Sequence, residues 1–430
     1  MKIRGLIIIC IANAIPLIWY GPLIAQGNGT AALGQYLGVV ALILMSITQL
    51  IATRINGIEA TFGSLDRVYV LHKWLAVIAI VASFLHENMD PDIGNIALIA
   101  GINDNAEDLG ELSYNGLLVL VGVSLITIIP YRFWRWSHRL IGIFFALAAA
   151  HYLLIEKPFA VFEPSGLYIT AFCVIGILSY LYLLIPREVG HNSLIYQVAD
   201  VVEHQDVIEV HLTPQGKGIT HKAGQFAFVN FKPLNLHETH PYTISNAPNP
   251  QGTLRFMVKG LGSYTKRIGQ VLEPGMTARV SNSFGHFTLT PTDGPQIWIA
   301  GGIGITPFMA WVDTLPPNWS MPTRLYYCVR NPEDVLQLPA FEQAAATVDN
   351  FDFSLVVSQR DKRLTAEQIV ADLRQDIRIA HVYFCGAESM RESLSKGLAQ
   401  QGLPRSHFHY EEFEMRTSLG LVRLVRRFLN

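Results

Sequence analysis

Six long apolar stretches lie in the first 190 residues and constrain the fold more than any other feature. Each is close to the 20 residues that a helix needs to cross the roughly 30 Å hydrocarbon core of a bilayer. Backbone N–H and C=O groups find no partners in lipid, so stretches of this kind fold as helices. The expected helices are about 5–24, 35–53, 69–89, 113–130, 138–155 and 166–186. The sequence therefore predicts a multi-domain membrane protein that begins with an all-α six-helix transmembrane bundle over 1–190.

The first stretch leaves two interpretations open. Lys2 and Arg4 precede an apolar run, and a signal-peptide cleavage site near Ala25 is the alternative to a membrane helix. The run is long for a signal peptide, which favours a retained helix.

Charges in the connecting loops predict the orientation of the bundle. One set of loops carries basic residues, namely Lys2, Arg4, Arg54, Arg67, Arg132, Arg135, Arg139 and Arg187. The opposite loops carry nine acids and one base, namely Glu87, Asp90, Asp92, Asp104, Glu107, Asp108, Glu111, Glu156, Glu163 and Lys157. Because basic loops stay on the cytoplasmic side, we expect a multi-pass membrane protein with both termini in the cytoplasm.

Four histidines are the only ones in the first 190 residues, and they fall on two of the expected helices. His72 and His86 lie on the third helix and His138 and His151 on the fifth. The spacing of 14 residues is almost four turns, the spacing of 13 residues is about 3.6 turns, and both correspond to about 20 Å of helix. Each helix therefore presents one imidazole near the cytoplasmic end and one near the outer end. Two facing imidazoles at each of two depths form the ligand set of two six-coordinate haems.

Other roles for these histidines remain open. A single intramembrane histidine often serves packing or a proton path, and a metal site is a further alternative. Zinc or copper would require clustered ligands rather than pairs about 20 Å apart. The chain has no CxxCH motif, so a haem would not be covalently attached.

The remaining composition excludes several classes of protein. The formal net charge of −2 argues against a nucleic-acid binder. The four cysteines, Cys10, Cys173, Cys328 and Cys385, form no CxxC pair. An iron–sulfur cluster, a zinc ribbon and a disulfide framework are therefore not expected.

The second half of the chain has the pattern of a soluble protein. Short alternating strands with turns about every ten residues predict an antiparallel β-barrel over 191–292. From 293 to 415 strands alternate with helical stretches, which predicts an α/β doubly wound nucleotide-binding domain with a parallel sheet. Residues 416–430 follow as a separate tail.

The paired histidines in a six-helix unit, followed by a soluble half, resemble the ferric reductase and NADPH oxidase superfamily, here in a bacterial-type form. That resemblance implies electron transfer from NADPH through FAD and two b-type haems across a membrane, which for a bacterial-type member is the inner (cell) membrane. His72 and His138 would then hold the inner haem, and His86 and His151 the outer haem.

The soluble half also resembles the ferredoxin–NADP reductase family over nearly all of 193–415. Gln225 precedes a segment similar to the family's flavin motif, with histidine in place of arginine: His240, Pro241, Tyr242, Thr243, Ile244 and Ser245. The resemblance implies that the Tyr242 ring flanks the isoalloxazine and that Thr243 or Ser245 reaches its polar edge. A second segment resembles the FAD pyrophosphate loop, through Lys259, Gly260, Gly262, Ser263 and Thr265. Its glycines would let backbone N–H groups approach anionic oxygens. Taken singly, each motif is equally compatible with a plain turn.

A glycine-rich turn after an apolar strand predicts the pyrophosphate site of a nicotinamide cofactor. It contains Gly301, Gly302, Gly304, Ile305, Thr306 and Pro307. Arg330, Ser358 and Arg360 match the family's NADPH-phosphate positions approximately, although Gln359 interrupts the usual Ser-Arg pair. We therefore expect NADPH to be preferred over NADH. The alternative is that both arginines are solvated loop charges.

The end of the soluble half carries the residues expected at the reacting centre. Cys385 and Gly386 match the family's Cys-Gly nicotinamide motif, in which the cysteine lies beside the hydride-transfer position. A buried core thiol is the alternative for Cys385. Glu411 and Phe413 match the terminal Glu-x-aromatic pattern, whose aromatic ring stacks on the flavin. Seventeen residues follow Phe413, whereas many relatives end at the aromatic, and this departure puts its stacking role in doubt.

The leading hypothesis is a transmembrane oxidoreductase that carries electrons from cytosolic NAD(P)H through FAD and two haems to an outer acceptor, either ferric iron or oxygen. The nine acids against one base on the outer side favour a cationic or neutral acceptor. The alternative is a membrane-anchored NAD(P)H–flavin reductase with structural histidines and a cytosolic partner. A haem conduit serving a periplasmic or membrane partner is a further alternative.

The tail has the pattern of a short basic amphipathic helix. Leu421, Leu424, Val425 and Phe428 recur at helical spacing, with Arg423, Arg426 and Arg427 on the remaining face. This pattern predicts docking on the inner leaflet, where anionic lipid attracts arginine. Packing on the reductase core and a frayed end are the alternatives.

Overall fold

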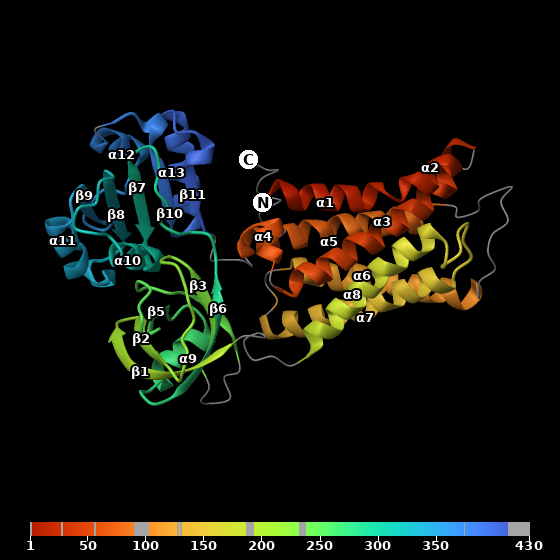
Figure 1. Cartoon of the computed structure of the whole chain (residues 1–430), viewed down its shortest axis with the longest axis horizontal. Helices are drawn as coiled ribbons and strands as arrows, with labels where there is room; N and C mark the ends of the chain where they lie inside the picture. The colour runs from red at the N-terminus through yellow and green to blue at the C-terminus, as the bar shows by residue number, and fades with distance from the viewer. Residues whose placement is uncertain are drawn as a thin grey trace. The chain divides into compact units, whose positions relative to one another are not determined.

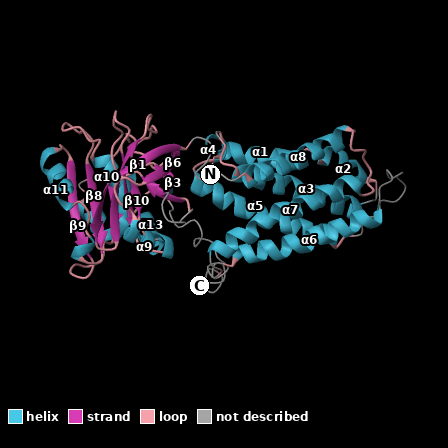
Figure 2. Ribbon diagram, turned by 90° about the horizontal axis from the view of Figure 1, so that it is seen from below, coloured by secondary structure: helices cyan, strands magenta, loops and turns pink. Residues whose placement is uncertain are grey.

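A computed structural model describes residues 2–26, 29–55, 57–89, 103–126, 129, 131–185, 193–231, 238–373 and 375–411. The chain divides into two compact units, one ending at residue 186 and one starting at residue 187. Among the described residues, the first unit consists of helices and the second of strands flanked by helices (Figure 2).

The first unit contains eight helices among its described residues, and Figure 1 shows the longer ones side by side. They are α1 (Ile3–Ala14), α2 (Leu17–Ala25), α3 (Gly29–Ala52), α4 (Ile58–Phe62), α5 (Leu65–Glu87), α6 (Asn103–Leu125), α7 (Tyr131–Leu154) and α8 (Pro164–Leu184). Each of the six predicted stretches falls mainly on one of these helices or, for the first stretch, on the α1–α2 pair. The first helix is interrupted at Ile15 and Pro16, and its two halves meet at a bend of 45°.

The expected count of six membrane spans is not confirmed. Four described helices are long and apolar enough to cross a membrane, or up to five if the bent pair α1–α2 forms one span. Of the six predicted stretches, the one that falls short lies on α6, which contains only residues 113–125 of the stretch and whose first turns carry Glu107, Asp108 and Glu111. Acidic side chains favour the positive end of a helix dipole, which explains why the helix extends beyond its apolar part.

Close packing between these helices depends on glycines that face aromatic rings. A Cβ added at Gly116 on α6 would lie 2.1 Å from the Phe144 ring of α7, and one at Gly142 on α7 would lie 2.1 Å from the Tyr180 ring of α8. Small residues of this kind let membrane helices approach each other closely. They therefore hold α6, α7 and α8 in fixed rotation about their axes.

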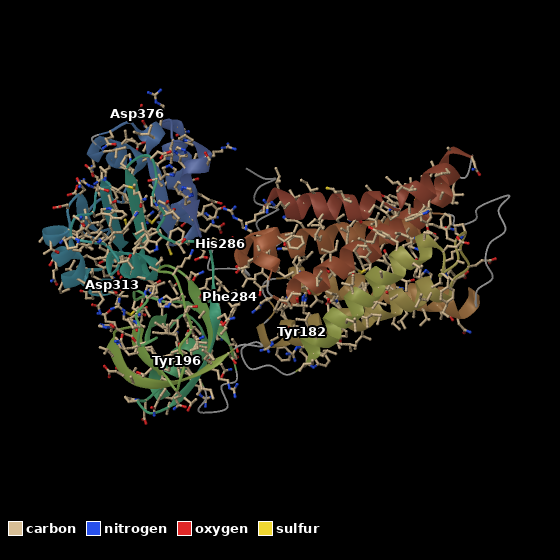
Figure 3. All side chains as sticks on the ribbon, viewed as in Figure 1. Tyr182, Tyr196, Phe284, His286, Asp313 and Asp376 are labelled. Carbon is tan, nitrogen blue, oxygen red and sulfur yellow. The ribbon has the colours of Figure 1, made fainter. Side chains whose placement is uncertain are left out.

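The first sheet of the second unit is antiparallel and curled. Its strands are β1 (Leu194–His204), β2 (Val207–Pro214), β3 (Phe226–Phe231), β4 (His240–Thr243), β5 (Leu254–Lys259) and β6 (Thr277–Phe284), in the order β4-β3-β6-β1-β2-β5. Between the two edges the described residues form one isolated bridge, Ile244 with Phe256, and hydrogen bonds such as Ser245 N–H to the Arg255 carbonyl oxygen (2.8 Å), but no continuous strand ladder. A fully closed barrel is thus not confirmed. Helix α9 (Ser263–Val271) follows β5, and Tyr196, labelled in Figure 3, is fully buried in the core of this sheet.

The second sheet is parallel, as the alternating pattern predicts. Its strands are β7 (Gln296–Gly301), β8 (Thr323–Val329), β9 (Phe351–Val357), β10 (His381–Cys385) and β11 (Phe408–Tyr410), in the order β11-β10-β7-β8-β9. The helices between them are α10 (Thr306–Val312), α11 (Leu338–Thr347), α12 (Ala366–Asp372) and α13 (Glu388–Gln400). Separate cores on its two faces contain Trp298 and Trp311 on one side and Phe384 and Leu398 on the other. The carboxyl ends of β7 and β10 therefore lie side by side, where such sheets bind their ligands.

Candidate functional site

The four intramembrane histidines form two facing pairs between α5 and α7. The ring centres of His72 and His138 are 6.1 Å apart, and those of His86 and His151 are 6.3 Å apart. The two pairs are 14 residues apart on α5, which corresponds to about 21 Å of helix. The structure thus brings together the residues that the spacing placed at matching depths.

A hydrogen bond fixes the rotation of each ring. The Nδ1 atoms of His72 and His86 contact the carbonyl oxygens of Thr48 (3.1 Å) and Gly34 (3.0 Å), both on α3. On the other side, Nδ1 of His151 contacts the carbonyl oxygen of Ala106 at 2.7 Å. A carbonyl oxygen can only accept, so Nδ1 carries the proton in these three rings and Nε2 keeps its lone pair.

The fourth ring is held by a side chain instead. Nδ1 of His138 contacts Oγ of Ser124 on α6 at 3.0 Å. The indole of Trp134 stacks on the same imidazole with ring centres 4.9 Å apart. Orientation of this histidine therefore depends on two neighbouring side chains rather than on backbone alone.

Two glycines, Gly38 and Gly110, leave room for the rings of the outer pair. Gly34 and Gly38 lie on one face of α3, and a Cβ at Gly38 would be 3.1 Å from the His86 ring. A Cβ at Gly110 on α6 would be 2.7 Å from Nδ1 of His151. The reasoning from sequence missed these positions, although the four-residue spacing of Gly34 and Gly38 is a known signal of close helix approach.

Each pair fits a flat metal-containing group held between two imidazoles. Metal–nitrogen bonds of about 2 Å, with about 1.1 Å from each nitrogen to its ring centre, would place the ring centres about 6.2 Å apart. The observed separations are 6.1 and 6.3 Å. Metal-binding histidines commonly donate their other ring N–H to an acceptor, as these do. Within the described ranges no cluster of three or more His, Cys, Asp or Glu side chains could hold a metal ion.

In the second unit, the predicted flavin residues gather around β4. The hydroxyl of Tyr242 is buried and finds no hydrogen-bond partner among the described residues, and burial raises its pKa. His240 lies within hydrogen-bond distance of Glu238 (Nε2 to Oε2, 2.9 Å) and stacks on Tyr264 with ring centres 4.3 Å apart. A buried hydroxyl of this kind is costly without a partner, so the surroundings of Tyr242 suit a bound polar group.

Two of the other predicted flavin residues are engaged within the protein. The hydroxyl of Ser245 donates to the carbonyl oxygen of Arg255 at 2.9 Å. Thr243 ends β4 and pairs with Phe226, while Pro241 and Ile244 occupy neighbouring positions of the same segment. Spacing alone did not indicate that Ser245 links β4 to β5.

The predicted pyrophosphate loop forms the start of α9. The Gly262 N–H donates to Oγ1 of Thr265 at 2.9 Å, which caps the helix. A Cβ at Gly262 would meet nothing within 4 Å, whereas one at Gly260 would lie 3.3 Å from a backbone oxygen. Nζ of Lys259 forms an ion pair with Asp206 at 3.2 Å. Ser263 begins the helix.

Two motifs that are more than 80 residues apart meet at the ends of β7 and β10. A Cβ at Gly304 would lie 2.3 Å from the carbonyl oxygen of Cys385, and one at Gly386 would lie 3.0 Å from Gly301. Gly302, with φ of +54°, starts the 3-10 turn Gly302–Ile305. Thr306 and Pro307 open α10 directly afterwards. Cys385 therefore lies beside the glycine-rich turn.

Glu411 connects this region to the antiparallel sheet. A Cβ at Gly285 would lie 2.7 Å from Oε1 of Glu411, and the side-chain amide of Gln225 donates to the Gly285 carbonyl oxygen at 3.0 Å. Burial and the charge of Glu411 both hold the pKa of the Cys385 thiol well above its usual value. The thiol is thus neutral at physiological pH, and residues predicted for both cofactors converge at one place.

Residues predicted for the 2′-phosphate lie on adjacent strand ends. The backbone N–H of Ser358 donates to Val329 (2.9 Å), and that of Gln359 donates to Arg330 (3.2 Å). The guanidinium of Arg360 pairs with Asp361 at 3.1 Å and its side chain is 65% exposed. Arg330 is exposed as well, so both cations are accessible, and that of Arg360 is partly neutralised by Asp361.

Contacts between the two sheets of this unit were not foreseen. Arg255 of β5 forms an ion pair with Asp313, which follows α10 and is labelled in Figure 3 (3.1 Å). Glu209 of β2 is buried, lies 2.9 Å from Nε2 of His211 and accepts a hydrogen bond from Gln337 at 2.9 Å. Single charged residues in strands carried no sequence signal for pairing across domains.

Phe413 and the tail 416–430 lie outside the described residues, so their predicted roles stay predictions.

Three family models match successive parts of the chain. They describe a ferric reductase like transmembrane component over 37–149, an FAD-binding domain over 193–296 and an oxidoreductase NAD-binding domain over 298–396. The chain belongs to the ferric reductase/NADPH oxidase superfamily. This superfamily member is a multi-pass membrane oxidoreductase with FAD-binding and NAD-binding domains.

Individual relatives match different portions. The chain is 23% identical over 248 residues to the toluate 1,2-dioxygenase electron transfer component of Pseudomonas putida, which covers 56% of this chain and 73% of that protein. It is 23% identical over 348 residues to dual oxidase 2 of Rattus norvegicus, which covers 70% of this chain and 22% of that protein. For four other matched reductase components the chain spans 52–64% of their length.

Among solved structures, a flavohemoglobin from Malassezia yamatoensis superposes with a TM-score of 0.51 at 15% identity, covering 92% of this chain and 98% of that one. This is a likeness of fold.

Proposed function

We propose that this protein carries electrons from cytosolic NAD(P)H, through FAD and two b-type haems, to an acceptor on the outer side of a bacterial inner membrane. The observation that supports the proposal is that His72 faces His138 and His86 faces His151, at two depths of the helical unit. Their ring centres are 6.1 and 6.3 Å apart, and each ring is turned by a hydrogen bond at Nδ1. Structural histidines would have no reason to share this arrangement at two depths.

At each level the chain would hold the iron of one haem through two Nε2 atoms. His72 and His138 would hold the inner haem, and His86 and His151 the outer one. Iron ligated in this way takes up and releases one electron at a time. Because two imidazoles would hold each iron, neither level would leave a place for a small molecule, and each would favour electron transfer.

In the reductase half the chain would bind FAD along β4 and α9 and the nicotinamide beside Cys385. FAD accepts a hydride as a pair of electrons and passes electrons on singly. Tyr242 would offer its unpartnered hydroxyl to the flavin, and the turn at Gly302, where a Cβ would meet nothing within 4 Å, would face the pyrophosphate. The neutral Cys385 thiol, fully buried beside the glycine-rich turn, would support that turn at the nicotinamide without adding charge, and Glu411 would orient the reacting centre.

NADPH is the expected donor because Arg330 presents an accessible cation at the strand ends that would face the adenosine. A guanidinium binds a phosphate through charge-assisted hydrogen bonds. Arg360 contributes less, since Asp361 already neutralises it.

The charge of the loops supports cytoplasmic termini and an acidic outer surface. That surface raises the local concentration of cations. We therefore favour a cationic ferric species or oxygen as acceptor over an anionic iron complex.

A second candidate function follows from the match to an electron transfer component of a dioxygenase system. In this case the protein would be a membrane-anchored NAD(P)H–flavin reductase that donates electrons to a partner protein. The histidine pairs would then serve packing alone.

Haem content and single-histidine variants separate the two candidates. Absorbance of the purified protein, expressed with ample haem, should show a reducible low-spin b-type spectrum with two haems per chain. His86→Ala should lose about one haem and keep flavin reduction by NADPH while transfer to the outside stops. His72→Ala should lose the other haem and interrupt the path at its entry.

Leu85→Ala is the matched control. Leu85 is next to His86 in the sequence, but it is 42% exposed, so its loss should not disturb the interior of the helical unit. It should retain both haems. Wild-type protein without haem would refute the transmembrane path and favour the anchored reductase, and loss of both haems from either histidine variant would refute the assigned pairing.

A further inference from the structure

One of the four histidines differs from the others in what its Nδ1 atom contacts. His72, His86 and His151 contact backbone carbonyl oxygens. His138 contacts the hydroxyl of Ser124. A side-chain substitution cannot remove a backbone carbonyl, so His138 is the one of these four whose partner depends on the identity of a side chain.

The direction of that hydrogen bond follows from the rest of the contacts of Ser124. Its hydroxyl donates to the carbonyl oxygen of Leu120 at 2.7 Å, one turn earlier on α6. A serine hydroxyl has one hydrogen, so toward His138 it can only accept. The proton of His138 therefore lies on Nδ1, and its Nε2 lone pair faces His72.

Trp134 contacts both His138 and Ser124. Its indole stacks on the His138 ring with an angle of 17° between the planes, and its Nε1–H donates to the Ser124 carbonyl oxygen at 3.3 Å. The hydroxyl, the indole and the imidazole thus form one connected unit between α6 and α7.

Such a hydrogen bond has an electronic consequence for a ligating imidazole. Donation from Nδ1–H makes Nε2 a stronger electron donor, which stabilises the oxidised metal more than the reduced metal. Loss of the acceptor should then make reduction easier. Hydrogen bonds to ligands are among the means by which proteins set haem potentials.

We propose that Ser124, held by Trp134, is a positioning residue that sets the tautomer of His138 and thereby the reduction potential of the inner haem alone. The inference rests on the proposed function, in which His72 and His138 hold that haem. Ser124 would then set the reduction potential of the inner haem, and with it the driving force for electron entry from the flavin, without changing the potential of the outer haem.

A potentiometric titration of the full-length haem protein tests this inference, with reduction followed by absorbance. Ser124→Ala should shift one of the two one-electron steps toward easier reduction. At a fixed ambient potential the ferric-to-ferrous ratio of that haem should fall about tenfold, which equals about 59 mV for a one-electron step. The other step should remain unchanged. Ser124→Thr keeps the hydroxyl and should restore the wild-type titration.

Ser113→Ala is the matched control. Ser113 also lies on α6 and its hydroxyl also reaches α7, where it donates to the Phe144 carbonyl oxygen at 2.8 Å rather than to an imidazole. It should leave both steps unchanged, so a shift confined to Ser124→Ala separates the hydrogen bond to His138 from a general weakening of the α6–α7 contact.

The outcomes distinguish this inference from the proposed function. Loss of one haem from Ser124→Ala with recovery in Ser124→Thr also supports a positioning role. Two haems with unshifted potentials in Ser124→Ala would overturn the inference while the transmembrane path stands. A wild-type protein that holds no haem would overturn both.

Discussion

Substitution of Gly110 by alanine should selectively weaken the outer haem site. Gly110 lies on α6 against His151, and an added Cβ would be 2.7 Å from Nδ1 and 2.9 Å from Cε1 of that ring. Ordinary contact begins at 3.4 Å, so the closest approach is 0.7 Å too short. Either the imidazole or the helix must move by about that amount.

The ring has little freedom to move without losing its hydrogen bond. Nδ1 of His151 contacts the carbonyl oxygen of Ala106 at 2.7 Å, one turn before Gly110 on the same helix. A shift of about 0.7 Å away from α6 lengthens this contact beyond an ordinary hydrogen bond. Loss of such a partner typically reduces metal affinity about 10- to 100-fold. We expect the haem content under limiting haem to fall from two to about one per chain.

Gly122→Ala is the control on the same helix, since a Cβ there would meet nothing within 4 Å. Both changes replace glycine by a better helix former, which favours the helix by up to about 1 kcal/mol. Gly38→Ala should be milder than Gly110→Ala, because its Cβ would be 3.1 Å from His86. Haem stoichiometry and the titration of the two haems measure all three variants.

Equal haem content and equal potentials in Gly110→Ala and Gly122→Ala would refute the steric reasoning. So would a loss confined to the inner haem, because Gly110 lies against the outer pair alone.

Three other predictions concern the reductase half. Arg330→Ala should lower the ratio of kcat/KM for NADPH over NADH about tenfold, about the value of one charge-assisted contact, and Arg360→Ala should lower it less; an unchanged ratio in both variants would remove the assignment. Burial raises the pKa of Glu209, but hydrogen bonds with His204 and Gln337 and the charges of Arg255 and His211 outweigh it, so the pKa lies below its usual 4.5. The contribution of the ionised Glu209 to stability is therefore complete above pH 4.5 and is lost as the pH falls through the lowered pKa. The Tm of Glu209→Gln should consequently fall less steeply with decreasing pH than the Tm of the wild type. Parallel curves of Tm against pH would contradict this. Cys385→Ala should slow flavin reduction in stopped-flow measurements. Because the thiol is neutral, the rate of flavin reduction in the wild type should not increase at alkaline pH in a way that Cys385→Ala removes. Such an increase would indicate a reactive thiolate.

Much of this architecture follows from the sequence because it depends on local patterns. Apolar runs of about 20 residues determine where membrane helices form, and a spacing of almost four turns places His72 and His86 on one face of their helix. The order of strands and helices in the nucleotide-binding domain follows in the same way from alternating short apolar runs and turns. Motif residues such as Gly302 and Gly386 were identifiable because their backbone conformation or close approach restricts the residue type.

The start of α6 and the curl of the first sheet are intermediate cases. Hydropathy detects only the part of α6 that suits lipid, so the acidic turns before it were not expected to be helical. Turn spacing predicts an antiparallel sheet, but whether its edges close depends on twist accumulated over six strands.

The tertiary structure alone decided which groups complete each site. The rotation of α6 against α7 brings His151 to Ala106 and His138 to Ser124. Glycines such as Gly116 set that rotation through contact with a ring on the other helix. That Glu411 lies beside Gly285 depends on how two sheets pack. Periodicity in a sequence specifies the face that an element presents, but not the residue it meets, because the partner is chosen by packing between segments that are far apart along the chain.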